Sequence, residues 1–352
     1  DMYLDVTGHP IDSMSLLGHR AVGVPGSVAG LFAAHDSLGR LPMARLIQPA
    51  IDLAAHGFPL TELEAKELNS KSSSIRKAST QPTPYTTKEH WVAGDTLRLS
   101  ELAQTLLRIR DAGRAGFYEG PTANLIVAEM QRGGGLIDHA DLANYRPVWR
   151  KPITGTYRDL EIITMGPPSS GGIVLIQALK AMESVNVGAS GWQKASTIHR
   201  MVDAERRAFA DRAALLGDPD FVQIPVERLV SNEYVSQRMA DFNEAQATPS
   251  SSVHAGDPLA ESEHTTHFSI VDEDGNAVSC TTTLNGSYGS GVVVGGAGFV
   301  LNNEMDDFSI GCNSPNRFGL VGSTANSIEP GKRMLSSMVS FVSTGRPSTN
   351  VP

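Results

Sequence analysis

The sequence predicts an α+β protein, and three observations carry that prediction. Apolar residues recur at helical spacing through much of the first two thirds of the chain. Strand-like alternation dominates the last third, where short apolar runs are separated by turn residues. No internal repeat and no linker-like segment divides the chain, so helices and paired strands are expected to pack as layers.

The composition excludes several classes of protein. The 352 residues include 40% hydrophobic and 19% charged residues, which is typical of a globular chain. The 29 Lys+Arg against 38 Asp+Glu give a net charge of −9, so no broad nucleic-acid surface is expected. No apolar run reaches the roughly 18 residues of a membrane span. Cys280 and Cys312 cannot build a disulfide framework or a cysteine zinc site, although one bridge between them stays open.

Helices are predicted wherever the apolar spacing is close to 3.6 residues. They run from Ser27 through Ala34, from Pro42 to Ala55, from Leu97 to Ile109, from Ala123 to Met130, from Ile173 to Met182 and from Ala195 to Leu216. Residues Asn69 to Pro84, rich in Ser, Thr, Lys and Pro, are instead expected to form a surface loop.

The helix from Ala195 to Leu216 carries both apolar and charged residues. Its apolar face is expected to hold Ile198, Val202, Ala208 and Phe209. Its charged residues are expected to lie on a solvated face, and these are Asp203, Glu205, Arg206, Arg207, Asp211 and Arg212.

Strands are predicted from alternation and from turn residues. Thr154 to Met165 is expected to form one half-buried strand. Thr266 to Val271 and Ala277 to Thr283 flank the turn residues 272–276, which predicts a hairpin. Val339 to Val342 is expected to form a further strand.

Metal and serine-hydrolase chemistry have little support in the motifs. His264 and His267 are three residues apart, which places them on opposite faces of a strand, and no metal site is expected. No Gly-x-Ser-x-Gly elbow is present. The pair Ser169 and Ser170 either hydrogen-bonds its own backbone or holds a ligand carboxylate.

Thr265 has two interpretations that local pattern leaves open. It is either a β-former at the start of a strand or an N-terminal nucleophile released by self-cleavage. In the second case its free α-amine, which titrates at about 7.7–8.0, accepts the proton of its own hydroxyl.

Seven segments in order along the chain resemble the γ-glutamyltransferase family, a branch of the N-terminal nucleophile hydrolases. They are Gly26–Gly30, Pro167–Gly172, Asp211–Phe221, Thr265–Ser269, Asp274–Val278, Leu301–Ser309 and Lys332–Met338. The resemblance implies a four-layer αββα sandwich, here incomplete at both ends, because family members extend beyond this chain on either side. An internal fragment of a longer product is therefore expected.

The resemblance also assigns roles to individual residues. Thr265 would attack the carbonyl of His264, which separates a large-subunit portion, 1–264, from the start of a small subunit, 265–352, within one domain. Thr265 would then be the catalytic nucleophile, with Thr283 as its hydrogen-bond partner. Donor-substrate binding would fall to Asn285, Glu304, Asp307, Ser336 and Ser337.

The reaction implied by the resemblance is a ping-pong transfer. Thr265 attacks the γ-amide of glutathione or a related γ-glutamyl compound, and water or an amino-acid or dipeptide acceptor takes the glutamyl group. No metal or organic cofactor is implied. An arginine expected before Asp1 and a Gly-Gly expected after Pro352 complete the family's site, so this fragment alone is expected to be inactive.

Two alternatives stay open beside that reaction. A cephalosporin acylase would use the same nucleophile on a glutaryl amide, although Asp307 argues for a donor that carries an ammonium group. An unprocessed homologue would keep the fold without catalysis. Phe318 stands where some relatives have a lid tyrosine, and a periplasmic or extracellular location is implied by the family.

Overall fold

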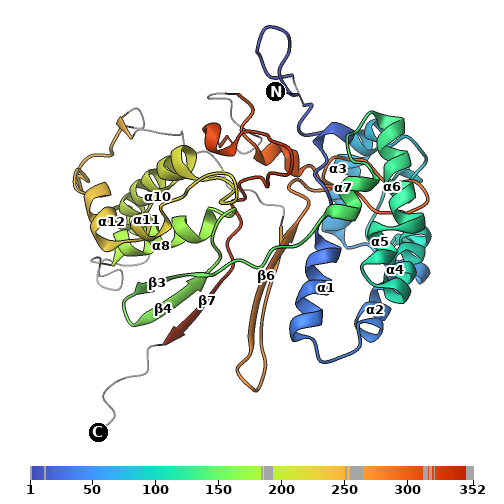
Figure 1. The fold of residues 1–352 in the computed structure, drawn as a ribbon, viewed down its shortest axis with the longest axis horizontal. Helices are drawn as coiled ribbons and strands as arrows, with labels where there is room; N and C mark the ends of the chain where they lie inside the picture. The colour runs from blue at the N-terminus through green and yellow to red at the C-terminus, as the bar shows by residue number, and fades with distance from the viewer. Residues whose placement is uncertain are drawn as a thin grey trace. The chain divides into compact units, whose positions relative to one another are not determined.

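The chain folds as two compact units, and each is discontinuous in sequence. In this computed structural model the described residues are 2–11, 13–183, 185, 193–249, 252–253, 265–311, 316, 319–320 and 322–345. Unit 1 comprises Asp1–Pro10, Arg150–Thr282 and Asp307–Pro352, and unit 2 comprises Ile11–Trp149 and Thr283–Asp306. Helices and sheets occur together, which confirms the α+β class (Figure 1). Within the described residues, no helix is long and apolar enough to cross a membrane.

Unit 1 contains a three-stranded antiparallel sheet in the order β3-β4-β7, formed by β3 (Ile153–Tyr157), β4 (Leu160–Thr164) and β7 (Phe341–Gly345). The single strand predicted from Thr154 to Met165 is therefore wrong, because the chain reverses within it. Arg158 takes a φ of 54° at the reversal, and Tyr157 faces Leu160 across the resulting hairpin. The alternation of apolar and polar residues continues through the two-residue turn between β3 and β4, so the sequence pattern gives no sign of the reversal.

Four helices of unit 1 gather beside this sheet (Figure 1). They are α8 (Gly171–Met182), α10 (Ala195–Leu215), α11 (Val226–Leu229) and α12 (Asn232–Arg238). Helix α8 contacts both β3 and α10. Its Ile173 packs with Leu216, Leu229 and Leu335 in a buried cluster, which places the segment around Leu335 against the start of α8.

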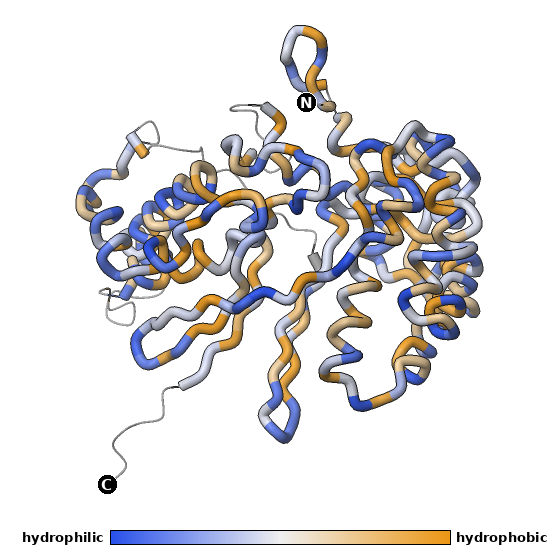
Figure 2. Tube along the Cα trace, in the orientation of Figure 1, coloured by the Kyte–Doolittle hydropathy of each residue, from blue (hydrophilic) through white to orange (hydrophobic). Residues whose placement is uncertain are grey.

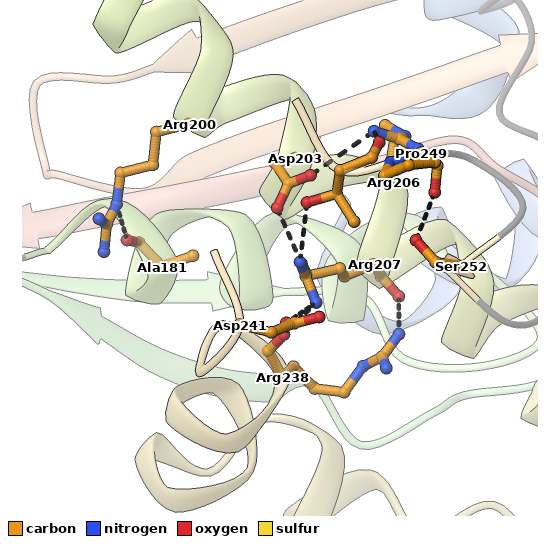
Figure 3. Close-up of polar contacts among 10 residues, drawn as sticks. Ala181, Arg200, Asp203, Arg206, Arg207, Arg238, Asp241, Pro249 and Ser252 are labelled. Atoms are coloured by element: carbon orange, nitrogen blue, oxygen red, sulfur yellow. Dashed lines mark hydrogen bonds and ion pairs between the residues drawn. The ribbon is translucent and has the colours of Figure 1, made fainter. Parts of the chain in front are cut away.

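Helix α10 buries only part of its predicted apolar face, since Ala208 is buried and Phe209 is half-buried. Ile198 and Val202 are each 47% exposed, whereas Asp203 and Arg207 are buried. Nε of Arg207 donates to Asp203 at 2.9 Å, and its Nη1 donates to Asp241 at 2.6 Å (Figure 3). Paired charges can be buried where lone ones cannot. The predicted solvated charged face is therefore wrong for Asp203, Arg207, Asp211 and Arg212, whereas Glu205 is exposed as predicted.

A second sheet joins β5 (Thr265–Val271) to β6 (Ala277–Thr283), as the predicted hairpin requires. The turn residues 272–276 form its hydrophilic tip (Figure 2), where Asp272 accepts a hydrogen bond from the backbone N–H of Asn276 at 2.8 Å. Across the strands, Nδ1 of His267 lies 2.8 Å from Oγ1 of Thr281. Cys280 on β6 is a free thiol, and Cys312 lies outside the described residues.

Unit 2 is mostly helical. Its helices are α1 (Ser27–Leu38), α2 (Met43–His56), α3 (Glu62–Ala78), α4 (Ser100–Ala112), α5 (Ala115–Tyr118), α6 (Gly120–Gly133) and α7 (His139–Asn144). A short two-stranded sheet, β1 (Phe58–Pro59) with β2 (Thr96–Leu97), lies among them. The helices expected at Ser27, Pro42, Leu97 and Ala123 are confirmed, with shifts of a few residues at their ends.

Helix α3 replaces much of the loop predicted from Asn69 to Pro84. Thr61 and Glu64 form a capping box at its start, in which each side chain accepts from the other's backbone N–H. The side of α3 that faces the core carries Ala65, Leu68, Ser72, Ile75 and Ala78, all buried. The helical spacing of these buried residues was not recognised, because the segment is rich in serine. The loop prediction is therefore wrong from Asn69 to Ala78.

Two buried clusters form the core of unit 2, and one segment serves both. Val292 and Val294 belong to the cluster around Ile126 and Met130. Val293, between them, belongs to the cluster around Leu68. Successive side chains of an extended backbone point to opposite sides. The segment therefore joins the two clusters of unit 2.

Candidate active site

The segment that holds Ser336 and Ser337 is fixed by the loop before α8. The Ser170 hydroxyl donates to the carbonyl oxygen of Ser336 at 2.9 Å, and the Ser170 N–H donates to the same oxygen at 2.8 Å. The Ser336 N–H donates in turn to the carbonyl of Pro168 at 2.9 Å. The Ser169 hydroxyl donates to the carbonyl of Met338. Two sequence motifs more than 160 residues apart are thus joined into one structure.

This arrangement settles what Ser169 and Ser170 do in the structure. Both are buried, at 2% and 1% exposure, and both hydroxyls donate to carbonyls of the 336–338 segment. One described side-chain contact of the pair is local, a weak hydrogen bond from the Gly171 N–H to Ser169 Oγ at 3.4 Å. Neither of the two roles considered from sequence describes the pair, because its main contacts are with a distant main chain.

Arg212, on the last turn of α10, supports the same segment from inside unit 1. Its Nε donates to Ser170 Oγ at 3.1 Å, and its Nη2 donates to Ser337 Oγ at 3.0 Å. Burial lowers the pKa of Arg212 to about 10, and the negative charge of Asp307 acts against this shift. The guanidinium therefore stays protonated at neutral pH. This role differs from the solvated position that the helical pattern predicts for Arg212.

The segment Leu301–Ser309 contains several polar residues, and the structure separates them by burial. Asn302, Asn303 and Asp306 are buried, whereas Glu304 and Asp307, in a short 3₁₀ helix, are half-buried. Asn302 Oδ1 accepts from the Gly23 N–H at 2.9 Å, and Asp306 accepts from the Ser15 hydroxyl at 2.7 Å.

The buried members of that segment are thus used in holding the chain together. Glu304 and Asp307 are the two carboxylates of this segment whose side chains are partly exposed. Those are the two that the resemblance assigns to the donor's charged groups. Their contact with a substrate stays a prediction.

Thr283 and Asn285 are brought together directly in unit 2. The Asn285 N–H donates to Thr283 Oγ1 at 3.0 Å. Asn285 adopts a φ of 70°, a left-handed conformation that asparagine tolerates better than most residues. Its side chain is buried and donates through Nδ2 to the carbonyl of Asn303 at 3.0 Å. One of its two amide protons is therefore already used within the protein.

Thr265 is the first residue of β5, the strand that pairs with β6. His264 and Phe318 lie outside the described residues, so the cleavage point and the predicted lid stay predictions. The predicted site residues are divided between the units: Thr265, Asp307, Ser336 and Ser337 belong to unit 1, and Thr283, Asn285 and Glu304 belong to unit 2. Within the part of the chain that the structure describes, no group of three or more His, Cys, Asp or Glu could hold a metal ion.

Solved structures with a similar fold define the class of protein. The chain aligns with the crystal structure of Helicobacter pylori γ-glutamyltranspeptidase at a TM-score of 0.69 and 37% identity, over 72% of this chain and 73% of that one. It aligns with a cephalosporin acylase from Bacillus halodurans at a TM-score of 0.79 and 28% identity, over 94% of this chain and 58% of that one. The fold is that of the N-terminal nucleophile hydrolases.

The family follows from sequence. The model of the γ-glutamyltranspeptidase family matches residues 1–349. The glutathione hydrolase proenzyme of Pseudomonas aeruginosa is 47% identical over 339 residues, which are 96% of this chain. The chain belongs to the γ-glutamyltranspeptidase family, and it spans 60% of the length of that relative.

Proposed function

We propose that the protein containing this chain is a γ-glutamyltransferase and glutathione hydrolase that matures by cutting its own chain before Thr265. One observation carries the proposal. The buried cation of Arg212 donates to the hydroxyl of exposed Ser337, and the half-buried carboxylate of Asp307 lies within its electrostatic range. The Ser337 hydroxyl can donate to a carboxylate, and the Asp307 carboxylate can bind an ammonium group. These two side chains therefore fit the α-carboxylate and α-ammonium groups of a γ-glutamyl compound.

Self-cleavage would proceed in two steps. The Thr265 hydroxyl attacks the carbonyl carbon of His264, and the peptide nitrogen becomes the leaving group, which gives an ester and a free α-amine. Water then hydrolyses the ester and releases a carboxylate on His264. The new α-amine of Thr265 has a pKa of about 7.7–8.0 and can accept the proton of the adjacent hydroxyl.

Catalysis would reuse the same hydroxyl. Thr265 Oγ1 attacks the γ-carbonyl carbon of the donor, and the amine leaves with a proton, which leaves a γ-glutamyl ester on the enzyme. Water or the amino group of an amino acid or dipeptide then attacks the ester and restores Thr265. Thr283 is proposed to hold the nucleophile by a hydrogen bond, and Asn285, Glu304, Asp307, Ser336 and Ser337 to hold the donor.

The experiment compares intact masses of the complete protein and two variants. We expect wild type to give two chains separated between His264 and Thr265, and Thr265→Ala to stay whole. Thr266→Ala is the matched control, since it removes the neighbouring hydroxyl of an exposed residue, and it should still be cut. A Thr265→Ala protein cut at the same bond would rule out this nucleophile.

A cephalosporin acylase activity is the second candidate, because a cephalosporin acylase is among the structures that share this fold. The two activities differ in the α-ammonium group, which a γ-glutamyl amide has and a glutaryl amide lacks. A carboxylate at Asp307 is complementary to that cation, which only the γ-glutamyl donor has. We expect γ-glutamyl anilide to be cleaved faster than glutaryl anilide, and the reverse order would favour the acylase.

A further inference from the structure

Arg212 differs from the other buried arginine of α10 in its partners. Arg207 is paired with Asp203 and Asp241. The hydrogen bonds of Arg212 go to neutral oxygens, namely Ser170 Oγ, Ser337 Oγ and the carbonyl of Leu335. The negative charge of Asp307 acts on the guanidinium through space, but among the residues that the structure describes no ion-pair contact includes Arg212. Only 3% of its surface is exposed.

Burial of the Arg212 cation costs free energy, because its hydrogen-bond acceptors are neutral. Desolvation of a charge is offset well by an opposite charge and only partly by neutral acceptors. A positive charge held in this way attracts an anion at the nearest exposed point of its hydrogen-bond network. That point is Ser337, which is exposed while Arg212 and Ser170 are buried.

The direction of the hydrogen bonds decides what Ser337 can offer. A serine hydroxyl has one proton and two lone pairs. Because Arg212 Nη2 donates to Ser337 Oγ, one lone pair is occupied and the proton is left to donate elsewhere. Ser170 shows the same polarity, since its oxygen accepts from Arg212 Nε and its proton goes to the carbonyl of Ser336. Such chains strengthen the terminal donor.

We propose that Arg212 is a positioning residue that turns Ser337 into a committed hydrogen-bond donor for the carboxylate of the donor substrate. Through Ser170 the same guanidinium fixes the main chain at Ser336, so one side chain orients both serines. This inference rests on the proposed function, since it takes Ser337 as part of the donor site. Arg212 acts through Ser337 and is not itself assigned a contact with substrate.

Three anilides that differ by one charged group separate this role from a structural one. γ-Glutamyl anilide has both the α-carboxylate and the α-ammonium, glutaryl anilide lacks the ammonium, and 4-aminobutyryl anilide lacks the carboxylate. Cleavage of all three is measured with the complete, self-processed protein. The variants are Arg212→Met, which removes the charge and the fork, and Arg212→Lys, which keeps the charge without the planar fork. Arg207→Lys is the control, a buried arginine of the same helix with ion-paired partners.

We expect Arg212→Met to reduce kcat/KM for the two carboxylate donors by about tenfold to a hundredfold, the range for losing a charge-assisted hydrogen bond. KM should account for most of that loss. Cleavage of 4-aminobutyryl anilide should change little, so the preference for the carboxylate falls. Arg212→Lys should give a smaller loss, and Arg207→Lys should leave the preference unchanged.

Equal losses on all three donors would overturn the inference, as would an unchanged preference in both Arg212 variants. Because Arg212→Met could also fail to fold, Ser337→Ala supplies a second test. If Arg212 acts through Ser337, the double variant Arg212→Lys/Ser337→Ala should lose no more of the preference for carboxylate donors than Ser337→Ala alone. Additive losses would show that the two side chains act independently. A wild-type protein that cleaves none of the donors would remove the proposed function itself, which is a distinct result.

Discussion

The hydroxyl of Ser170 donates a hydrogen bond of 2.9 Å to the carbonyl oxygen of Ser336, a residue 166 positions later in the chain. Ser170 also accepts from Arg212, so it lies between a buried cation and the backbone of a predicted substrate-binding residue. The loop before α8 thereby determines where Ser336 and Ser337 are placed. Its sequence conveys this only indirectly, because its partners are far away along the chain.

Replacing Ser170 by alanine should both destabilise unit 1 and impair donor binding. The change leaves Arg212 Nε without an acceptor in a buried position, and we expect a loss of about 1–3 kcal/mol in the free energy of unfolding. Urea unfolding in the uncleaved Thr265→Ala background measures it on a single chain. Ser70→Ala is the control, since the hydroxyl of exposed Ser70 donates to the carbonyl of Glu67 in the same helix, and it should change stability by less than about 0.5 kcal/mol. Equal effects of the two variants would contradict the role given to Ser170.

The glycine at the start of α8 should be intolerant of any side chain. A Cβ at Gly171 would collide with the carbonyl group of Met338, in the segment that Ser169 and Ser170 hold. We expect Gly171→Ala to destabilise by more than about 2 kcal/mol, because backbone cannot yield as a side chain can. Gly30→Ala, within α1, meets nothing within 4 Å and should stabilise by roughly 0.5–1 kcal/mol. Thermal unfolding of both variants checks these opposite signs, and a stable Gly171→Ala would refute the close approach.

The ion pair between Arg207 and Asp203 gives a third prediction. Arg207→Ala leaves the carboxylate of Asp203, which is 1% exposed, with the weaker Arg206 contact at 3.5 Å as its one ion pair among the described residues. Removing one partner of a buried pair typically costs about 3–5 kcal/mol. The comparison is the pair of half-buried Arg110 and exposed Asp111, and Arg110→Ala should cost less than about 1 kcal/mol. Urea midpoints distinguish the two, and similar losses would mean that burial of the α10 pair has no consequence.

Helix α10 shows what sequence could and could not predict. Its bounds are predicted to within one residue, because periodicity is a local property. Its buried face is predicted only in part, because Ala208 is buried but apolar Ile198 and Val202 are exposed and Asp203 is buried. The pairing that makes this tolerable involves Asp241, 34 residues beyond Arg207. No single-sequence rule connects two charges at that separation.

The site divides in the same way. The family resemblance predicted Ser336, Ser337 and Asp307 as site residues. The structure adds that Glu304 and Asp307 are partly exposed, whereas Asn302 and Asn303 of the same segment are buried. Arg212 was missed because an arginine beside an aspartate on a long helix usually faces water. Its place in the segment Asp211–Phe221 was the available signal, since that segment is one of those that resemble the family.

Glu129 is expected to make the free energy of unfolding of unit 2 depend on pH in the acid range. Its side chain is fully buried, and Oε1 lies 2.9 Å from His19 Nε2 and 2.8 Å from the Thr80 hydroxyl. Burial would raise the pKa of Glu129, but the hydrogen bonds from His19, Arg132 and Thr80 outweigh it and hold the pKa at about 2. Arg132 pairs with the second oxygen, Oε2.

The sign of the effect follows from the direction of the shift. A carboxylate whose pKa is lower in the folded state contributes stability above its unfolded pKa of about 4.3 and loses it as the pH falls toward about 2. We expect the free energy of unfolding to fall by about 2–3 kcal/mol across that interval through Glu129 alone. Glu129→Gln should be less stable at neutral pH and should lose less on acidification. The matched control is Glu89→Gln, at an exposed position, which should keep the wild-type dependence. Urea unfolding between about pH 6 and 2.5 gives the comparison, and parallel curves for wild type and Glu129→Gln would show that this carboxylate is not linked to folding.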